Sequence, residues 1–169
     1  MMFSFDVSGR VLKQARAPSG SEKGHLKGTE QGLPDLRVLW ILFEALPTIL
    51  GPNGAALILY HIGQKFAEAA ITVSKECGLN PASTIEDLFQ KSGLGWIEIG
   101  QVGCVAAIEE RYSSLPVSGE GGFVSCYFIR GIFRQYLRHA LGRDVEVQEK
   151  RCRAFGSSFC EFREKSGLL

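Results

Sequence analysis

The period of the hydrophobic pattern changes once along this chain, and that change constrains the fold more than any other feature. Apolar residues first recur every three or four positions, as in amphipathic helices, over residues 33–51, 55–76 and 83–89. From Trp96 to Ser113 they alternate, as in two paired strands joined by a turn near residues 100–103. A further helix over 123–141 and two short strands complete the pattern. The order predicts an α+β fold, in which helices pack on a twisted antiparallel sheet.

Glycines and capping residues predict where these helices begin and end. Gly51 opens a Gly-Pro-Asn-Gly turn between the first two helices, and Gly78 and Gly142 follow the last turns of later ones. Ser83 and Glu86 have the spacing of a capping box, which predicts a short helix beginning at Ser83.

A single globular domain is predicted from the 169 residues. Residues 1–32 are expected to form an N-terminal strand, around Phe3, Phe5 and Val7, and a flexible loop over 15–32. A loop of that length is either mobile or covers a site. Residues 33–169 form the domain proper.

Charge and hydropathy exclude some partners. Nineteen basic against eighteen acidic residues leave a formal charge of +1, which argues against direct nucleic-acid binding. Since no uninterrupted apolar run reaches about 18 residues, we expect no membrane span. The N-terminal residues do not resemble a signal peptide, so a cytoplasmic location with reduced thiols is expected.

The most informative residues lie in the C-terminal third. Cys126, Glu149, Cys152 and Cys160 form the pattern C-x22-E-x2-C-x7-C, on one helix and the strand-turn-strand that follows it. Three thiolates and a carboxylate could hold a zinc ion and pin the helix to the hairpin. Buried thiols are the alternative, and spacing alone does not decide between the two. Of the remaining cysteines, Cys104, inside an apolar run, and Cys77, beside a helix-ending glycine, fit the buried-thiol interpretation.

Longer stretches around these residues resemble a known family. The segment HALGRDVEVQEKRCRAFGSSFCEF, preceded by a helix starting GGFVSCYFIRGIF, resembles the 4-vinyl reductase domain family. LILYHIGQKFAEAA and GLGWIEI resemble that family's glycine-spaced helix and the following strand, so the resemblance covers about Leu33 to Lys165. It implies structural zinc at Cys126, Glu149, Cys152 and Cys160. It also implies the fold of aromatic-sensor domains and of small vesicle-trafficking subunits, and a homodimer.

The resemblance further implies a pocket for a hydrophobic or aromatic small molecule between helices and sheet. Gly63 is expected to leave room for it in the helix wall, and Trp96 or His61 to orient a ligand oxygen. The predicted pocket residues are Tyr60, His61, Gly63, Phe66, Trp96, Tyr112, Phe123 and Tyr127. Aromatic side chains that simply fill the core are the alternative. Near Glu110 or Arg111 the phenol sensors carry a Trp, which puts phenol recognition in doubt.

Function narrows to three classes. The sequence has no dinucleotide, P-loop or nucleophile-elbow motif, which favours a ligand-binding sensor domain over an enzyme. The alternatives are a tetrapyrrole 4-vinyl reductase or its substrate carrier, and a dimeric scaffold subunit. The helix with Trp40 and Phe43 is the predicted dimer surface. Arg130, Arg134 and Arg138 form a helix stripe that is either a solvated face or an anion site.

Overall fold

The computed structural model describes residues 38–101, 103–108, 117 and 123–165. The predicted N-terminal strand and loop, and Tyr112, lie outside these residues. The elements in chain order are α1 (Val38–Cys77), α2 (Pro81–Lys91), β1 (Gly95–Ile99), β2 (Gly103–Ile108), α3 (Val124–Leu141), β3 (Val147–Arg151), the 3-10 turn η2 (Arg153–Phe155) and β4 (Cys160–Glu164).

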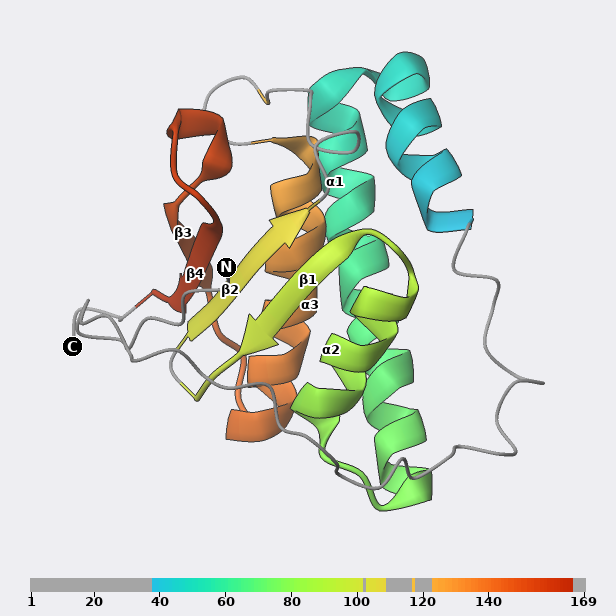
Figure 1. Cartoon of the computed structure of the whole chain (residues 1–169), viewed down its shortest axis with the longest axis vertical. Coiled ribbons are helices and arrows are strands. Elements are labelled where there is room, and N and C mark those ends of the chain that lie inside the picture. Colours follow the sequence, from blue (N-terminus) through green and yellow to red (C-terminus); the bar gives the residue numbers. More distant parts are fainter. Residues whose placement is uncertain (1–37, 102, 109–116, 118–122, 166–169) are drawn as a thin grey trace, which may run out of the picture. The chain divides into compact units, whose positions relative to one another are not determined.

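The four strands form one antiparallel sheet in the order β1-β2-β4-β3. Helices α1 and α3 lie side by side and cover one face of it (Figure 1). This arrangement confirms the predicted α+β fold with helices on an antiparallel sheet. It also makes β3 an edge strand, whose outer side has no strand neighbour among the described residues.

Helix α1 is two helical halves that meet at Gly51, where the chain folds back on itself (Figure 1). Gly51 has φ 69° and ψ 168°, a backbone conformation that is strained for residues other than glycine. Pro52, which has no N–H to leave unpaired, begins the second half. At its far end Leu79 N–H donates to Ser74 O at 2.8 Å, across the left-handed Gly78. The predicted break at Gly51 and the predicted end at Gly78 are confirmed. The predicted turn over residues 51–54 is too long, because Gly51 alone leaves the helical conformation and the helix resumes at Pro52.

The predicted start of α2 is wrong by two residues. The helix begins at Pro81, because the Asn80 side chain accepts hydrogen bonds from the N–H groups of Ala82 (2.9 Å) and Ser83 (3.2 Å). Glu86 does not close a capping box. Its carboxylate accepts a hydrogen bond from Ile99 N–H at 2.7 Å and so ties α2 to β1.

Two glycines bring α1 and α3 into backbone contact. A Cβ at Gly63 would overlap the carbonyl of Phe128, and a Cβ at Gly131 would overlap the carbonyl of Tyr60. The sequence suggested that the missing side chain at Gly63 leaves room for a ligand. That prediction is wrong, because the α3 backbone fills the space.

Phe128 lies at the centre of the core. Its ring meets those of Phe43, Phe66 and Phe89 at centroid distances of 5.3, 5.8 and 6.3 Å. Such offset and edge contacts add to the stability that burial itself provides. The sequence suggested Phe43 as part of a dimer surface. Phe43 is only 5% exposed, so its ring is not available to a second copy of the chain.

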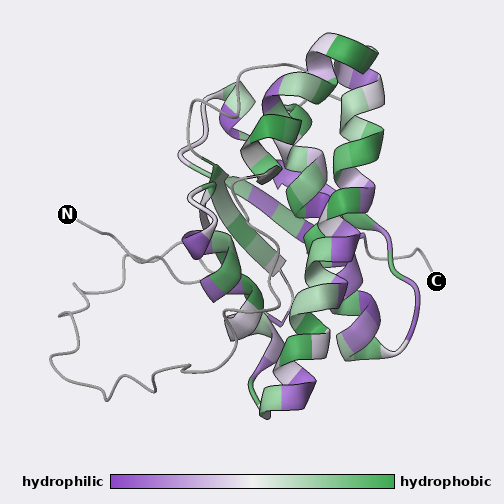
Figure 2. Cartoon of the chain, turned by 90° about the vertical axis from the view of Figure 1, so that its right-hand side faces the viewer, coloured by the Kyte–Doolittle hydropathy of each residue, from purple (hydrophilic) through white to green (hydrophobic). Residues whose placement is uncertain are grey.

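Apolar residues also lie on the outer surface of α1, most of them near the fold-back. Ile41, Ile49, Leu50, Leu57 and Ile58 are exposed there, Ile49 by 73%. Figure 2 shows hydrophobic residues along much of this helical layer. By length and composition alone, the helix over Ile41–Cys77 contains a stretch of 18 residues apolar enough to cross a membrane. The expectation of no span rested on uninterrupted runs, a stricter measure. The opposite face of α1, including Leu59 and Ala67, is buried in the domain core.

Candidate metal centre

Three elements bring four potential metal ligands together. Cys126 lies in the first turn of α3, Glu149 in the middle of β3, Cys152 between β3 and η2, and Cys160 at the start of β4. Their ligand atoms all lie within 4.8 Å of one another. The hairpin achieves this because the loop through Gly156, at φ 86°, returns the chain to Cys160 beside Cys152.

The spacing of the sulfur atoms fits a tetrahedral metal site. Cys126 Sγ lies 3.6 Å from both Cys152 Sγ and Cys160 Sγ, and the last two are 4.0 Å apart. A zinc ion with Zn–S bonds of about 2.3 Å holds its sulfur ligands about 3.8 Å apart. The three thiols are therefore placed as three corners of such a tetrahedron.

Glu149 supplies a buried oxygen that needs a partner. Among the described residues, nothing donates a hydrogen bond to its buried Oε1. Burial and the neighbouring Cys152 raise the pKa of the Glu149 carboxyl to about 8. A buried polar atom without a partner is costly, and a cation among the four ligands would satisfy it.

The thiols form one hydrogen-bonded group. Hydrogen bonds with Cys152 and Cys160, together with burial, raise the pKa of Cys126, whereas hydrogen bonds from Cys126 and Cys160 lower that of Cys152. Cys160 Sγ also accepts a hydrogen bond from Arg153 N–H at 3.4 Å. Without a cation the group can therefore hold little negative charge, and a divalent cation would favour ionisation of all four ligands.

Helix α3 and strand β3 meet in a regular seam that ends at this cluster. Cys126, Arg130 and Arg134 lie four residues apart on α3 and face successively earlier residues of the β3 segment. Arg130 Nε donates to Val147 O at 2.8 Å, and Arg134 Nε donates to Val145 O at 2.9 Å. The two guanidinium groups thus cover carbonyls beside and along the edge strand.

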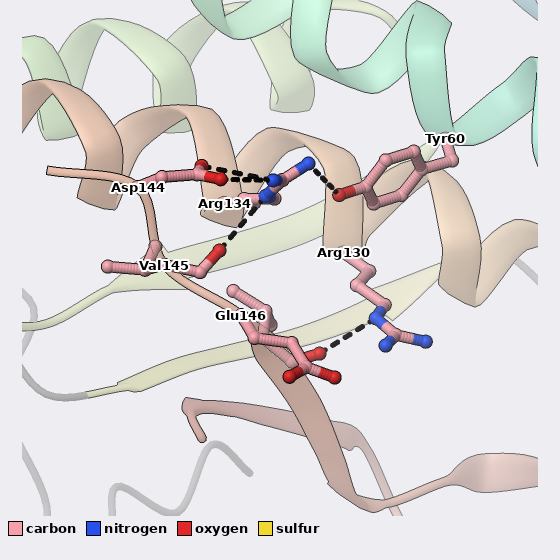
Figure 3. Close-up of a pocket in the computed structure, with 7 residues that line it drawn as sticks. Tyr60, Arg130, Arg134, Asp144, Val145 and Glu146 are labelled. Carbon is pink, nitrogen blue, oxygen red and sulfur yellow. Dashed lines mark hydrogen bonds and ion pairs between the residues drawn. The ribbon is translucent and has the colours of Figure 1, made fainter. Parts of the chain in front are cut away.

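Arg134 also reaches α1 and the turn after α3 (Figure 3). It donates to Tyr60 Oη at 2.8 Å and to both carboxylate oxygens of Asp144 at 2.8 and 3.0 Å. Of the predicted arginine stripe, only Arg138 is exposed. Neither a solvated face nor an anion site describes Arg130 and Arg134, because backbone carbonyls occupy them. The sequence could not show which backbone carbonyls would face these two arginines.

The remaining thiols and histidines lie elsewhere. Neither Cys77 nor Cys104 belongs to the cluster. Cys104 is buried, as predicted, but the prediction of a buried thiol is wrong for Cys77, which is exposed in the last turn of α1. His61 is exposed and hydrogen-bonds Gln64 at 3.1 Å, and His139 is also exposed.

The predicted pocket residues do not share one cavity in the described part of the chain. Tyr60 lines a polar pocket of about 430 Å³ with Arg130 and Arg134 (Figure 3). Trp96 is 43% exposed on β1, and Phe66 packs on Phe128. Two further spaces do adjoin the metal cluster, and each contains one predicted residue, Phe123 or Tyr127.

These two spaces differ in size and character. A narrow apolar niche of about 10 Å³ lies between β2 and α3. It is lined by Ala106, Ile108, Phe123, Ser125, Cys126, Ile129, Arg153 and Cys160. A polar surface pocket of about 290 Å³ also reaches Cys126. It is lined by Cys126, Tyr127, Arg130, Glu146, Gln148, Glu149 and Lys165.

Comparison with known proteins supports the resemblance over the C-terminal part. Residues 113–165, which contain all four cluster residues, match the family model of the 4-vinyl reductase domain. A vinyl-4-reductase family protein from Methanocaldococcus jannaschii is similar at 21% identity, over 63% of this chain and 66% of that one, with a TM-score of 0.44. The phenol-responsive sensory domain of the transcription activator PoxR, solved with phenol, is similar at 17% identity, over 96% and 84%, with a TM-score of 0.47. No curated protein matches the sequence.

Proposed function

Because residues 113–165 match the 4-vinyl reductase domain, we propose that this chain is a small-molecule-binding sensor domain built around one structural zinc ion. The observation that carries the proposal is the convergence of Cys126, Glu149, Cys152 and Cys160 within 4.8 Å. Three soft sulfur donors and one carboxylate, at tetrahedral spacing, suit zinc.

The zinc would be structural. Four protein ligands leave no open position for water or substrate, so the ion would hold α3 against the β3–β4 hairpin and take no part in chemistry. Such a clip joins residues 126 and 160, which otherwise meet through packing and a thiol–thiol hydrogen bond. Metal binding of this kind adds directly to folding free energy.

The apolar niche between β2 and α3 is the proposed ligand site. Its walls are mostly apolar, with Ser125 and Arg153 as polar groups that could orient a ligand. At about 10 Å³ it has room for about one water, so a ligand of aromatic size binds there only if the side chains that line it move apart. The rigid side is the metal-anchored helix start at Cys126.

Native mass spectrometry of the freshly purified full chain tests both parts. We expect one zinc per chain and a co-purified or added aromatic compound bound to it. Ala106→Leu, which adds bulk inside the niche, should abolish ligand binding and retain zinc. The same change at exposed Ala140 is the matched control. Ligand binding that survives Ala106→Leu would place the site elsewhere.

We also propose that the chain forms a homodimer through the exposed apolar surface of α1. The support is the group of exposed side chains near the fold-back, led by Ile49 and Leu57. Sedimentation should show a dimer at micromolar concentration and a monomer for Ile49→Lys. A wild-type chain that sediments only as a monomer would contradict it.

A further inference from the structure

We infer that metal ions reach and leave the four-residue cluster through the polar surface pocket beside β3, on the Glu149 side. The inference rests on the proposed zinc site and adds a route to it. Its evidence is the unequal surroundings of the four ligands.

The three thiols are closed off from solvent. Cys126, Cys152 and Cys160 are exposed by only 4, 4 and 7%. Glu149 is half-buried and lies on the edge strand. The pairing of β3 with β4 is also irregular between Glu149 and Arg151. The carboxylate is therefore the ligand that can turn away from the cluster with least disturbance of the fold.

Size separates the two spaces that touch the cluster in the described part of the chain. About 10–15 Å³ of such space holds one water, so a divalent ion with its six waters needs about 60–90 Å³. The pocket that contains Cys126 and Glu149 measures about 290 Å³, which is enough. The niche that contains Cys126 and Cys160 measures about 10 Å³, which is not.

The polar groups of the pocket suit a cation in transit. Glu146, Gln148 and Glu149 line it with oxygen donors, the type that a hydrated divalent ion accepts in place of its water. Of its two basic residues, Lys165 pairs with Glu146 at 3.0 Å and Arg130 binds Val147 O at 2.8 Å. Both basic side chains thus bind acceptors of the protein, which reduces their repulsion of an incoming metal ion.

Exchange of bound zinc for added Cd²⁺ tests the route, because the full chain is metal-bound both before and after the exchange. The rate is followed by the ultraviolet absorption of the cadmium–thiolate bonds. Gln148 is exposed and lines the pocket. Gln148→Glu should speed exchange about threefold at low salt and Gln148→Arg should slow it about threefold, since a unit charge in the path attracts or repels the ion. Both effects should shrink as salt screens the charge.

Ser158 provides the matched control. It is exposed, lies two residues from Cys160 and does not line the pocket. Ser158→Glu and Ser158→Arg bring the same charges close to the cluster and should change the rate by less than about 1.5-fold. Equal effects at the two positions, or no effect at Gln148, would overturn the route. Zinc content is measured first: a chain without zinc overturns the metal site and the route together, whereas a zinc-bound chain with no charge effect at Gln148 overturns the route alone.

Discussion

Replacing Gly131 by alanine should destabilise the domain, although alanine favours helix formation. In an exposed helix this change would stabilise by about 1 kcal/mol. Here the new methyl group would overlap the carbonyl of Tyr60, so α1 and α3 must separate. A gap of 0.5–1 Å forfeits about a quarter to a half of each dispersion contact across the interface.

The interface at risk is large. It includes the fully buried Leu59, Phe128 and Ile132, and each such side chain makes tens of contacts of about 0.1–0.2 kcal/mol. Separation would also lengthen the hydrogen bond from Arg134 to Tyr60, now 2.8 Å. After the gain in helix propensity, we expect a net loss of about 3 kcal/mol in the free energy of unfolding.

Urea denaturation followed by circular dichroism measures that loss. Ala69→Gly, at an exposed position of α1, is the control for helix propensity and should cost about 1 kcal/mol. The reasoning fails if Gly131→Ala leaves the free energy of unfolding unchanged or raises it. That result would mean that the two helices have room to spare, as a cavity between them would provide.

Three further outcomes follow from the contacts described. Cys152→Ser should lose bound metal, as measured by atomic absorption, and should lower the melting temperature. Cys104→Ser is the control and should keep its metal. Metal retained in Cys152→Ser refutes the ligand assignment. Arg134→Met removes hydrogen bonds to three residues and should lower the free energy of unfolding by about 2–3 kcal/mol in urea denaturation. The same change at exposed Arg138 should lower it by about 0.5 kcal/mol or less. Equal losses for the two variants would contradict this. Burial raises the pKa of Glu86, so its folded form binds a proton more tightly than its unfolded form. The stability that it contributes is present at acid pH and is lost as pH rises through the folded pKa, so wild type should lose stability over that range relative to Glu86→Gln in pH-dependent melting; parallel curves would argue against it.

Local features of the sequence determined most of the elements. The apolar period, and glycines that alone adopt positive φ readily, predicted α3 with its end at Gly142 and the fold-back at Gly51. The start of α2 was missed because Asn80 and Ser83 both make good caps, and the sequence does not show which one the chain uses. The four cluster residues were found because their residue types and spacing match the family pattern, whereas spacing alone left buried thiols as the alternative.

The pairing of distant surfaces was decided only by the tertiary structure. Gly63 suggested an empty space, but α3 brings Gly131 and its own backbone into that space. The arginines suggested a solvated stripe, but the edge strand presents its carbonyls to them, and Arg134 meets Tyr60 from 74 residues away. Periodicity shows which face of an element is apolar. It does not show which partner covers that face or at what depth, because close packing depends on the shapes of both surfaces at once.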